Sequence, residues 1–422
     1  MQTLQQGFVN DTAVPASLCA RCLGTRFLCG KPVCPIMVRY YAYQSSKTFL
    51  ESKEIDGLSP PGVFIGRYGY PNVNIGPFIA PSDEQISILD APEAWVGKSI
   101  DEITSMRFSM VRAKSRVNVQ QQENKIFSLV QEIALSKSAP ELEVTFRKPP
   151  RASITLDENV QPFGPSGVVE RLRAYTGGFD DKMEKLYHDT DADATTAVLE
   201  LYRKGVPVSS IQRGFSAGCF GVGRKRRMVP TRWSITAVDD ILGRSMLNEN
   251  KQNPVIDEWR IYKLEALSNR WVVLMLPTSW RYELIEAWYP NTTWNPTGRQ
   301  ISIVSSHEFF NGRREYAEIG GCYYAARLAV NELMRREHFQ AGVVILREAH
   351  PGYIMPVGVW NVREHVRLAL KGKPDILGSF SECKSVIEHF LDIPFSRWAA
   401  ESGVLKDMLV QRRVEDFIQS LS

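Results

Sequence analysis

The sequence predicts an α+β protein, in which helices and an antiparallel sheet are joined to a small cysteine-rich unit near the start and a docking tail at the end. Short runs rich in β-branched and aromatic residues are separated by turn residues, as in β-hairpins. Other segments repeat apolar residues at helical spacing. Strands and helices do not alternate as regularly as in a doubly wound parallel sheet, which favours α+β over α/β.

The first half of the main body is predicted to begin with a hairpin. Residues 63–68 and 73–75 are short β-rich runs on either side of a Gly-Tyr-Pro-Asn turn. Residues 119–136 have helical spacing, and 142–146 have the pattern of a following strand. Further helices are expected over residues 167–175, 182–187, 195–202 and 209–215.

The second half is predicted to combine a meander with helices. Thr236, followed three residues later by Asp239, predicts a capping box at the start of one more helix. Residues 260–267, 271–276 and 281–288 are expected to form three consecutive antiparallel strands. Further strands are expected at 301–304 and 343–347, and helices at 323–336, 361–371 and 381–391.

Composition restricts the class of protein. Of 422 residues, 44% are hydrophobic and 10% aromatic, which indicates a packed globule and not a disordered chain. The chain has 51 Lys and Arg and 47 Asp and Glu. The resulting net charge of +4 is too small for a protein whose whole body coats nucleic acid. The apolar run at residues 271–276 is far shorter than a membrane span. No secretory signal pattern is present, so we expect an intracellular, cytoplasmic protein without membrane association.

Four parts are predicted along the chain. A leader and the cysteine unit cover residues 1–38, and the helix-rich part of the body covers 39–250. The part that contains the meander covers 251–405. The docking tail covers 406–422.

Four of the seven cysteines fall within one short segment with the spacing C-x2-C-x6-C-x4-C, namely Cys19, Cys22, Cys29 and Cys34. Two cysteine pairs at such spacing can bind one tetrahedral Zn²⁺, and a closed shell of four thiolates indicates a structural ion. An iron–sulfur cluster or two disulfides are the alternatives, and disulfides fit poorly with an intracellular chain. The scattered cysteines, Cys219, Cys322 and Cys383, are expected to be small buried hydrophobic residues.

The last residues have the pattern Gln-x-x-aliphatic-x-x-aromatic-bulky, formed by Gln411, Val414, Phe417 and Ile418. This pattern resembles the peptide with which proteins dock on the DNA sliding clamp (PCNA), where apolar side chains on one helical turn fill a groove. Val414 stands where Ile, Leu or Met is usual, and Ile418 replaces a second aromatic residue, so we expect roughly micromolar affinity. The alternative is an amphipathic helix that packs on its own domain.

A glycine-rich loop precedes a basic run, and together they are candidates for contact with phosphate or nucleic acid. The glycines at 214, 218, 221 and 223 follow neither the Walker A pattern nor the dinucleotide fingerprint. The alternative is a surface loop with solvated charges. Trp233 is a candidate for base stacking or, more often for such a residue, for the core. The candidate contacts are Arg224, Lys225, Arg226, Arg227 and Arg232.

Two smaller patterns were weighed for catalysis. Asp189, Asp191 and Asp193 alternate, as ligands of a divalent ion can, although acidic residues at a helix start are the commoner explanation. His307 and Glu308 follow one another as an acid/base pair would, but a structural histidine is the alternative. No pattern of a nucleophile with its base stands out.

The whole sequence resembles the archaeal Nre family of DNA-repair proteins, the NreA type. The resemblance rests on the cysteine cluster with Leu-Cys-Gly-Lys (28–31), on Ser-Pro-Pro-Gly-Val-Phe-Ile-Gly-Arg-Tyr-Gly-Tyr-Pro (59–71), Gly-Val-Pro-Val-Ser-Ser-Ile-Gln-Arg (205–213), Val-Pro-Thr-Arg-Trp-Ser-Ile-Thr-Ala-Val-Asp-Asp (229–240) and Gly-Cys-Tyr-Tyr-Ala-Ala-Arg-Leu-Ala-Val (321–330). It implies participation in DNA repair, a zinc finger at the four clustered cysteines, and clamp binding by the tail that begins at Gln411. It implies no catalytic mechanism that can be assigned to residues.

These observations predict a repair factor that the sliding clamp recruits to DNA through its tail, with the zinc finger and the basic run as DNA contacts. An enzyme acting on a nucleotide or phosphodiester is the second hypothesis, with the glycine-rich loop holding phosphate and Asp189 or His307 assisting. The third is an RNA-associated zinc protein.

Overall fold

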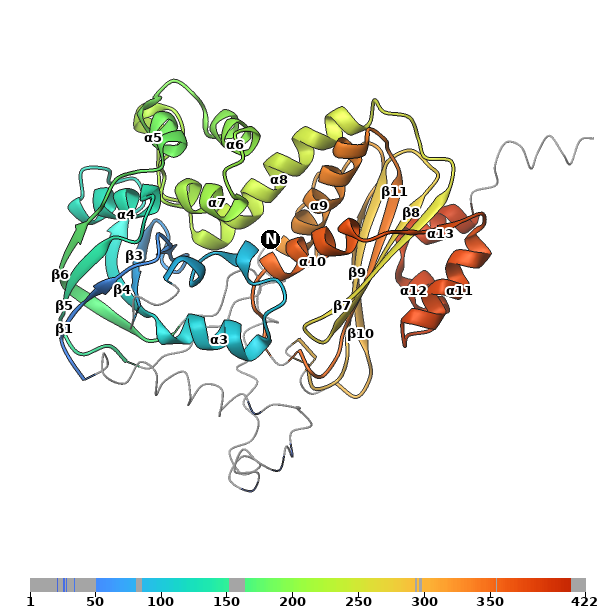
Figure 1. Ribbon diagram of the computed structural model, residues 1–422, viewed down its shortest axis with the longest axis horizontal. Helices are drawn as coiled ribbons and strands as arrows, with labels where there is room; N and C mark the ends of the chain where they lie inside the picture. Colours follow the sequence, from blue (N-terminus) through green and yellow to red (C-terminus); the bar gives the residue numbers. More distant parts are fainter. Residues whose placement is uncertain are drawn as a thin grey trace, which may run out of the picture.

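The computed structural model describes residues 51–80, 86–151 and 164–410, except 293, 296, 297 and 354, and the single residues 21, 26, 28 and 34. The described chain forms two six-stranded sheets with helices packed against them and between them (Figure 1). Both sheets mix parallel and antiparallel pairs. The predicted α+β class is confirmed.

The first sheet confirms the predicted hairpin. Its strands, in spatial order, are β1 (Glu54–Leu58), β5 (Glu141–Phe146), β6 (Ser166–Tyr175), β4 (Val111–Asn118), β3 (Asn72–Ile79) and β2 (Val63–Ile65). Strands β2 and β3 pair antiparallel around the predicted turn. The predicted helix at 167–175 is wrong, because β6 pairs with β5 over most of its length. Apolar positions three apart, such as Val169 and Leu172, fit a helix as well as a strand, and tertiary pairing decides between them.

The helices of the first half pack in two apolar clusters: the helix at residues 100–109 packs with Trp95 and Trp360, and the others share the core of this sheet. Apart from short 3-10 turns, they are α3 (Ile100–Ser109), α4 (Lys125–Leu135), α5 (Asp181–His188), α6 (Ala194–Arg203), α7 (Val208–Ser216) and α8 (Thr231–Asn250). The predicted capping box at Thr236 is wrong, because α8 begins directly after Pro230, a residue that favours a helix start. Asp239 therefore lies inside the helix, where its carboxylate binds Arg363.

The second sheet corrects the predicted meander. Its strands, in spatial order, are β10 (Ser302–Glu308), β9 (Arg281–Trp288), β11 (Gly342–Ala349), β8 (Asn269–Leu276), β7 (Trp259–Ala266) and β12 (Asp375–Leu377). Strand β11 lies between β8 and β9, antiparallel to the first and parallel to the second. Every residue of β11 is buried, and such a strand needs a central position with helices on both faces.

Helices cover both faces of the second sheet. They are α9 (Gly321–Glu337), α10 (Trp360–Lys371), α11 (Phe380–Phe390), α12 (Phe395–Glu401) and α13 (Gly403–Val410). Figure 1 shows α8, α9 and α10 between the two sheets and α11 to α13 on the far side of the second. Asp239 of α8 and Arg363 of α10 form a buried ion pair of 3.0 Å in this central layer. The helices predicted near 323–336, 361–371 and 381–391 are confirmed.

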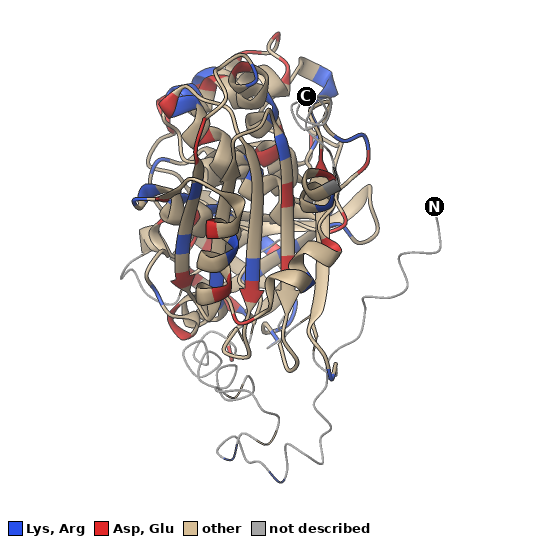
Figure 2. Cartoon of the chain, turned by 90° about the vertical axis from the view of Figure 1, so that its right-hand side faces the viewer, with Lys and Arg blue, Asp and Glu red and all other residues tan. Residues whose placement is uncertain are grey.

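Charged residues of both signs are interspersed on the side of the molecule that Figure 2 shows. Within the described ranges, no helix combines the length and the apolar character needed to cross a membrane. With a net charge of only +4, contact with nucleic acid would depend on local groups and not on the charge of the whole body.

Candidate nucleic-acid interface

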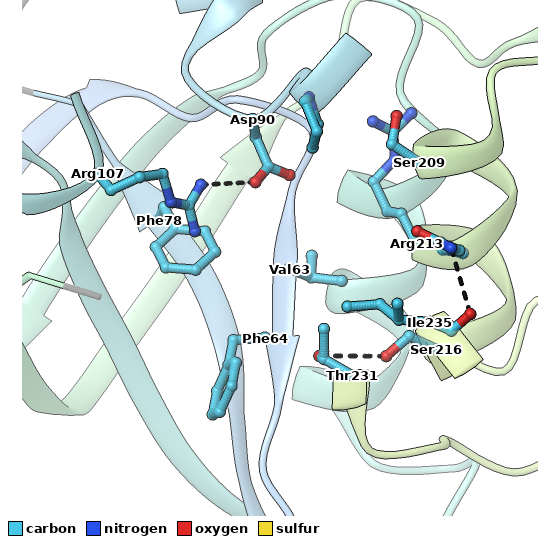
Figure 3. A pocket seen from close by; sticks show the side chains of 12 residues that line it. Val63, Phe64, Phe78, Asp90, Arg107, Ser209, Arg213, Ser216, Thr231 and Ile235 are labelled. Carbon is cyan, nitrogen blue, oxygen red and sulfur yellow. Dashed lines mark hydrogen bonds and ion pairs between the residues drawn. The ribbon is translucent and has the colours of Figure 1, made fainter. Parts of the chain in front are cut away.

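A small pocket lies where the β2–β3 hairpin meets α3, α7 and α8 (Figure 3). Its volume is about 40 Å³, which holds a few water molecules but is too small for a nucleobase. Segments 59–71, 205–213 and 229–240, which are distant in sequence, each supply part of its lining. The pocket therefore marks the junction at which these segments are fixed to one another.

A buried ion pair closes one side of this pocket. Arg107 of α3 donates to the Asp90 carboxylate at 2.6 Å and to the carbonyl oxygen of Leu89 at 3.1 Å. Burial raises the pKa of Asp90, although Arg107 opposes this, and burial lowers the pKa of Arg107. A Cβ added at Gly62 would lie 1.9 Å from Oδ2 of Asp90. Only glycine at this point of the Pro-Pro-Gly turn leaves room for the carboxylate.

Two hydroxyl groups on the opposite side fix the start of α8 against the hairpin. The Thr231 hydroxyl accepts a hydrogen bond from the backbone N–H of Ile65 at 2.9 Å. The Ser216 hydroxyl donates to the carbonyl oxygen of Val229 at 2.8 Å and lies 3.3 Å from the Thr231 hydroxyl (Figure 3). Because these hydroxyls are bonded to the backbone and to each other, their arrangement positions elements and does not resemble an activated nucleophile.

Three exposed aromatic side chains lie just outside this junction, and we call Tyr68, Tyr70 and Trp233 the aromatic face. The rings of Tyr70, at the hairpin tip, and Trp233, in the first turn of α8, are 5.3 Å apart between centroids. The guanidinium of Arg67 lies 4.9 Å from the centre of the Tyr68 ring and donates to its hydroxyl at 3.1 Å. Trp233 is 45% exposed, so the interpretation of it as a core residue is wrong.

The structure brings the basic run, residues 224–227, beside the hairpin that carries this face. The backbone N–H of Val119 donates to the carbonyl oxygen of Pro71, next to Tyr70, at 3.0 Å. The carbonyl oxygen of Val119 accepts from the N–H of Met228, directly after the run, at 2.8 Å. The single residue Val119 is therefore bonded to the hairpin tip on one side and to the end of the basic run on the other.

The predicted basic contact residues differ in their exposure and in their hydrogen bonds. Arg224, Lys225 and Arg227 are exposed, and Arg232, in the first turn of α8, is half-buried. The guanidinium of Arg226 instead donates to three backbone carbonyl groups at 2.5 to 2.6 Å, those of Tyr187, Asp189 and Gly221. Arg226 therefore stabilises the loop on which its basic neighbours lie.

Two of the alternating aspartates bind backbone N–H groups at and just before the start of α6. Asp189 accepts hydrogen bonds from the N–H groups of Asp191 and Ala192, and Asp193 caps α6 through the N–H of Thr196 at 2.7 Å. These hydrogen bonds lower the pKa of Asp189 and of Asp193. The interpretation as acidic residues at a helix start is confirmed.

The two residues that could assist the glycine-rich loop in a nucleotide-processing enzyme lie at different places in the fold. Asp189 follows α5, whereas His307 lies on β10 at the other side of the molecule (Figure 1). The His307 ring packs against Gly403, where an added Cβ would meet it at 2.7 Å. Glu308 is buried and paired with Arg327 at 2.9 Å. His307 therefore lies apart from the glycine-rich loop, whereas Asp189 lies beside that loop, where Arg226 binds the carbonyl oxygens of both Asp189 and Gly221.

One group of side chains in the described residues has the composition of a metal site. Ligand atoms of Glu348, His350 and Asp392 lie within 4.8 Å of one another. Arg270 already binds Asp392 at 2.5 Å, and Glu348 accepts the N–H groups of Asp392 and Ile393. Both carboxylates therefore have partners within the protein, and their arrangement does not require a metal ion.

Two predicted sites fall largely or wholly outside the described residues. Of the four clustered cysteines, only Cys34 is described, and it is partly buried. The clamp-docking residues Gln411, Val414, Phe417 and Ile418 all follow the last described residue, Val410. Both sites remain predictions.

Tyr68, Tyr70 and Arg116 are contact candidates that the sequence patterns did not predict. The available signal was the Arg-Tyr-Gly-Tyr-Pro turn, which places two aromatic residues at a hairpin tip, where side chains are exposed. Arg116 gave no such signal, because it reaches the tip only through the pairing of β4 with β3.

Comparisons with known proteins match most of the chain to one family. A model of the archaeal Nre N-terminal region matches residues 28–295, and one of the archaeal Nre C-terminal region matches 308–417. The chain is 39% identical to DNA repair protein NreB of Archaeoglobus fulgidus, over 92% of this chain and 97% of the relative. It is 36% identical to NreA of the same organism, over 86% and 91% of the two chains.

A third relative, DNA repair protein NreA of Haloferax volcanii, is 31% identical over 82% of this chain and 84% of its own. No solved structure matches the chain. The four segments 59–71, 205–213, 229–240 and 321–330, on which the resemblance rests outside the cysteine cluster, all fall within the matched ranges. The chain belongs to the archaeal Nre family.

Proposed function

We propose that this protein is a DNA-repair factor that contacts DNA through its basic run and the neighbouring aromatic face. Its relatives NreA and NreB are named DNA repair proteins. The observation that carries the DNA contact is the position of Val119, which joins the basic run to the hairpin tip. Cations for phosphates and rings for bases are thereby combined on one surface, as in proteins that bind nucleic acid.

The clamp-docking tail is the proposed means of recruitment. Its first residue, Gln411, directly follows α13, which packs on the second sheet through Val404 and Leu405 and through an ion pair of 2.7 Å between Arg281 and Asp407. A docking peptide placed directly after an anchored helix is available to a partner while the body stays folded. With a net charge of only +4, the protein gains more from such docking than from bulk attraction to DNA.

The clustered cysteines are proposed to bind one structural zinc ion. The ligands would be Cys19, Cys22, Cys29 and Cys34, whose thiolates suit tetrahedral Zn²⁺. The ion would hold together a unit that is too short to bury a core of its own. This unit is a second candidate DNA contact.

The DNA contact is tested by removing charge from the basic run. Arg224→Ser with Arg227→Ser should weaken binding of single-stranded DNA and flatten the dependence of log K on log salt by roughly 1.4, the slope for two lost phosphate contacts. Lys371→Ser with Lys373→Ser removes the same charge from exposed positions at and just after the end of α10 and should leave both values unchanged. An equal effect of the two double variants would show that only bulk charge matters and would overturn the proposal.

A further inference from the structure

We infer that the aromatic face binds single-stranded DNA by stacking unpaired bases on Tyr68, Tyr70 and Trp233. The inference rests on the proposed DNA contact and names its substrate. The three side chains are 73%, 42% and 45% exposed, respectively. Large aromatic rings exposed together, and not scattered singly, mark an interaction surface. Each ring keeps more than a third of its surface accessible, so a base can lie against it.

Arginines beside the rings provide the charge that an anionic strand requires. Arg67 lies over the Tyr68 ring at 4.9 Å. Arg116, exposed on β4, reaches the tip at Gly69, where an added Cβ would come within 2.6 Å of its Nη2. Gly69 also has a φ of 79°, a conformation that favours glycine. The turn therefore holds two cations near these rings, Arg67 at Tyr68 and Arg116 at Gly69, where they can bind the phosphates between stacked bases.

The rings are held by the body of the protein and do not depend on a loose loop. The hairpin tip is fixed by the hydrogen bond from Val119 to Pro71, and Trp233 is fixed by α8, whose first residue, Thr231, binds Ile65. Trp233 then packs on Tyr70 with an angle of 53° between the ring planes. A surface that is ordered before binding loses little side-chain entropy when a strand arrives.

The surface fits a single strand and not a duplex. In a duplex the base faces are covered by neighbouring pairs, so rings can reach them only after unstacking, whereas an unpaired strand offers every base face. Stacking also tolerates any sequence, because all four bases have a π-face. A repair factor that recognises damaged or processed DNA by its unpaired bases requires both properties.

A fourth ring extends the surface along α8. Tyr316 is 56% exposed and packs on Tyr324, at the start of α9, with 5.4 Å between ring centroids. Burial of part of the side chain raises the pKa of the Tyr316 hydroxyl, and the positive charge of Arg232 opposes this shift. The charge of Arg232, the residue before Trp233, therefore also acts on Tyr316.

The first test replaces exposed rings and measures the binding of single-stranded DNA. Trp233→Leu should weaken binding of a labelled single-stranded oligonucleotide by about tenfold, the effect of losing one stacked base, and Trp233→Phe should restore most of it. Tyr68→Leu added to Trp233→Leu should weaken it further. Trp294→Leu and Tyr175→Leu, which replace rings exposed to 38% and 51% elsewhere, are the matched controls and should bind as the native protein does.

An oligonucleotide of abasic residues, with the same phosphates but without bases, separates the two contributions. It should bind the native protein and the Trp233→Leu variant equally weakly, and the slope of log K against log salt should be the same for both proteins. Duplex DNA of the same length should bind at least about tenfold more weakly than the single strand.

Three results would overturn the inference in distinguishable ways. If Trp233→Leu binds normally while Arg224→Ser with Arg227→Ser binds poorly, the DNA contact stands and base stacking is wrong. If the native protein binds neither single-stranded nor duplex DNA, the proposed DNA contact fails as well. If RNA of the same sequence binds more than about tenfold better than DNA, the 2′-hydroxyl is recognised and the ligand is RNA.

Discussion

The indole ring of Trp233 lies against the ring of Tyr70, with 5.3 Å between their centroids, although one residue lies in the first turn of a helix and the other in a hairpin turn. The hydrogen bond from Ile65 to Thr231 holds the same two segments together two residues before Trp233. The candidate interface therefore forms only when hairpin and helix pack, and its integrity depends on the buried contacts behind it.

The ion pair between Asp239 and Arg363 is one of these contacts. Both side chains are buried, and Asp239 also accepts from Gln212 at 2.9 Å. Asp239→Ala would leave the Arg363 cation in the interior with only Glu364 as partner, so we expect the free energy of unfolding to fall by about 3 kcal/mol in urea titrations. Arg244→Ala, which removes an exposed pair with Asp240, should cost less than about 1 kcal/mol. Equal losses in the two variants would contradict this account.

Gly62 is predicted to be required by the Asp90 carboxylate. In Gly62→Ala the new methyl group would lie only 1.9 Å from Oδ2 of Asp90. This overlap would push the carboxylate away from Arg107. We expect a loss of about 2 kcal/mol in the free energy of unfolding, because a buried charge loses its partner. In an Asp90→Ala background the same substitution should cost much less. Gly378→Ala, where the nearest atom is 3.9 Å away, is the control and should be nearly neutral.

His365 is predicted to make the protein less stable in acid. Burial lowers the pKa of His365 to about 4, and its Nδ1–H donates to the carbonyl oxygen of Asn361 at 2.7 Å. Because the unfolded chain takes up the proton near pH 6.5 and the folded protein only near 4, stability is complete at neutral pH and falls across that window. Relative to His365→Asn, the native protein should lose about 2 kcal/mol between pH 7 and about 4.5. Parallel pH profiles of the two proteins would show that His365 is not buried in its neutral form.

The clamp-docking tail is tested by calorimetry with the sliding clamp. Gln411→Ala with Phe417→Ala should abolish binding, because the polar contact and the aromatic anchor are both removed, while the melting temperature of the body stays unchanged. Arg412→Ala with Glu415→Ala alters positions outside the pattern and is the control. Val414→Leu adds one buried methylene, worth about 0.8 kcal/mol, and should tighten binding about fourfold. Unchanged binding of the first double variant would refute the docking role.

Metal content tests the cysteine cluster. We expect one zinc ion per chain by elemental analysis, and its loss in Cys19→Ser with Cys22→Ser. Cys322→Ser, outside the cluster, should retain the ion. Iron together with inorganic sulfide would assign an iron–sulfur cluster in its place, and a chain without metal would show that the cysteines have another role.

Much of the local structure could be predicted, because it is encoded within short windows. The hairpin at residues 63–75, helix α9 and the all-buried strand β11 each have an apolar period or turn that belongs to one conformation. Strand β6 was mistaken for a helix because its apolar spacing fits both, and only its pairing with β5 distinguishes them. The order of the second sheet could not be predicted, since strand neighbours depend on long-range packing and not on position in the chain.

The sequence by itself determined the fold class, the family and the basic run, because composition, motifs and neighbouring charges are properties of contiguous residues. The tertiary structure decided which of those charges stay exposed and which stabilise the fold. Arg226 is bound to three backbone carbonyl groups, whereas Arg224 and Arg227 remain exposed on the same loop. It also decided that Tyr70 and Trp233 share one surface, since a contact between distant segments exists only after the chain has buried the core between them.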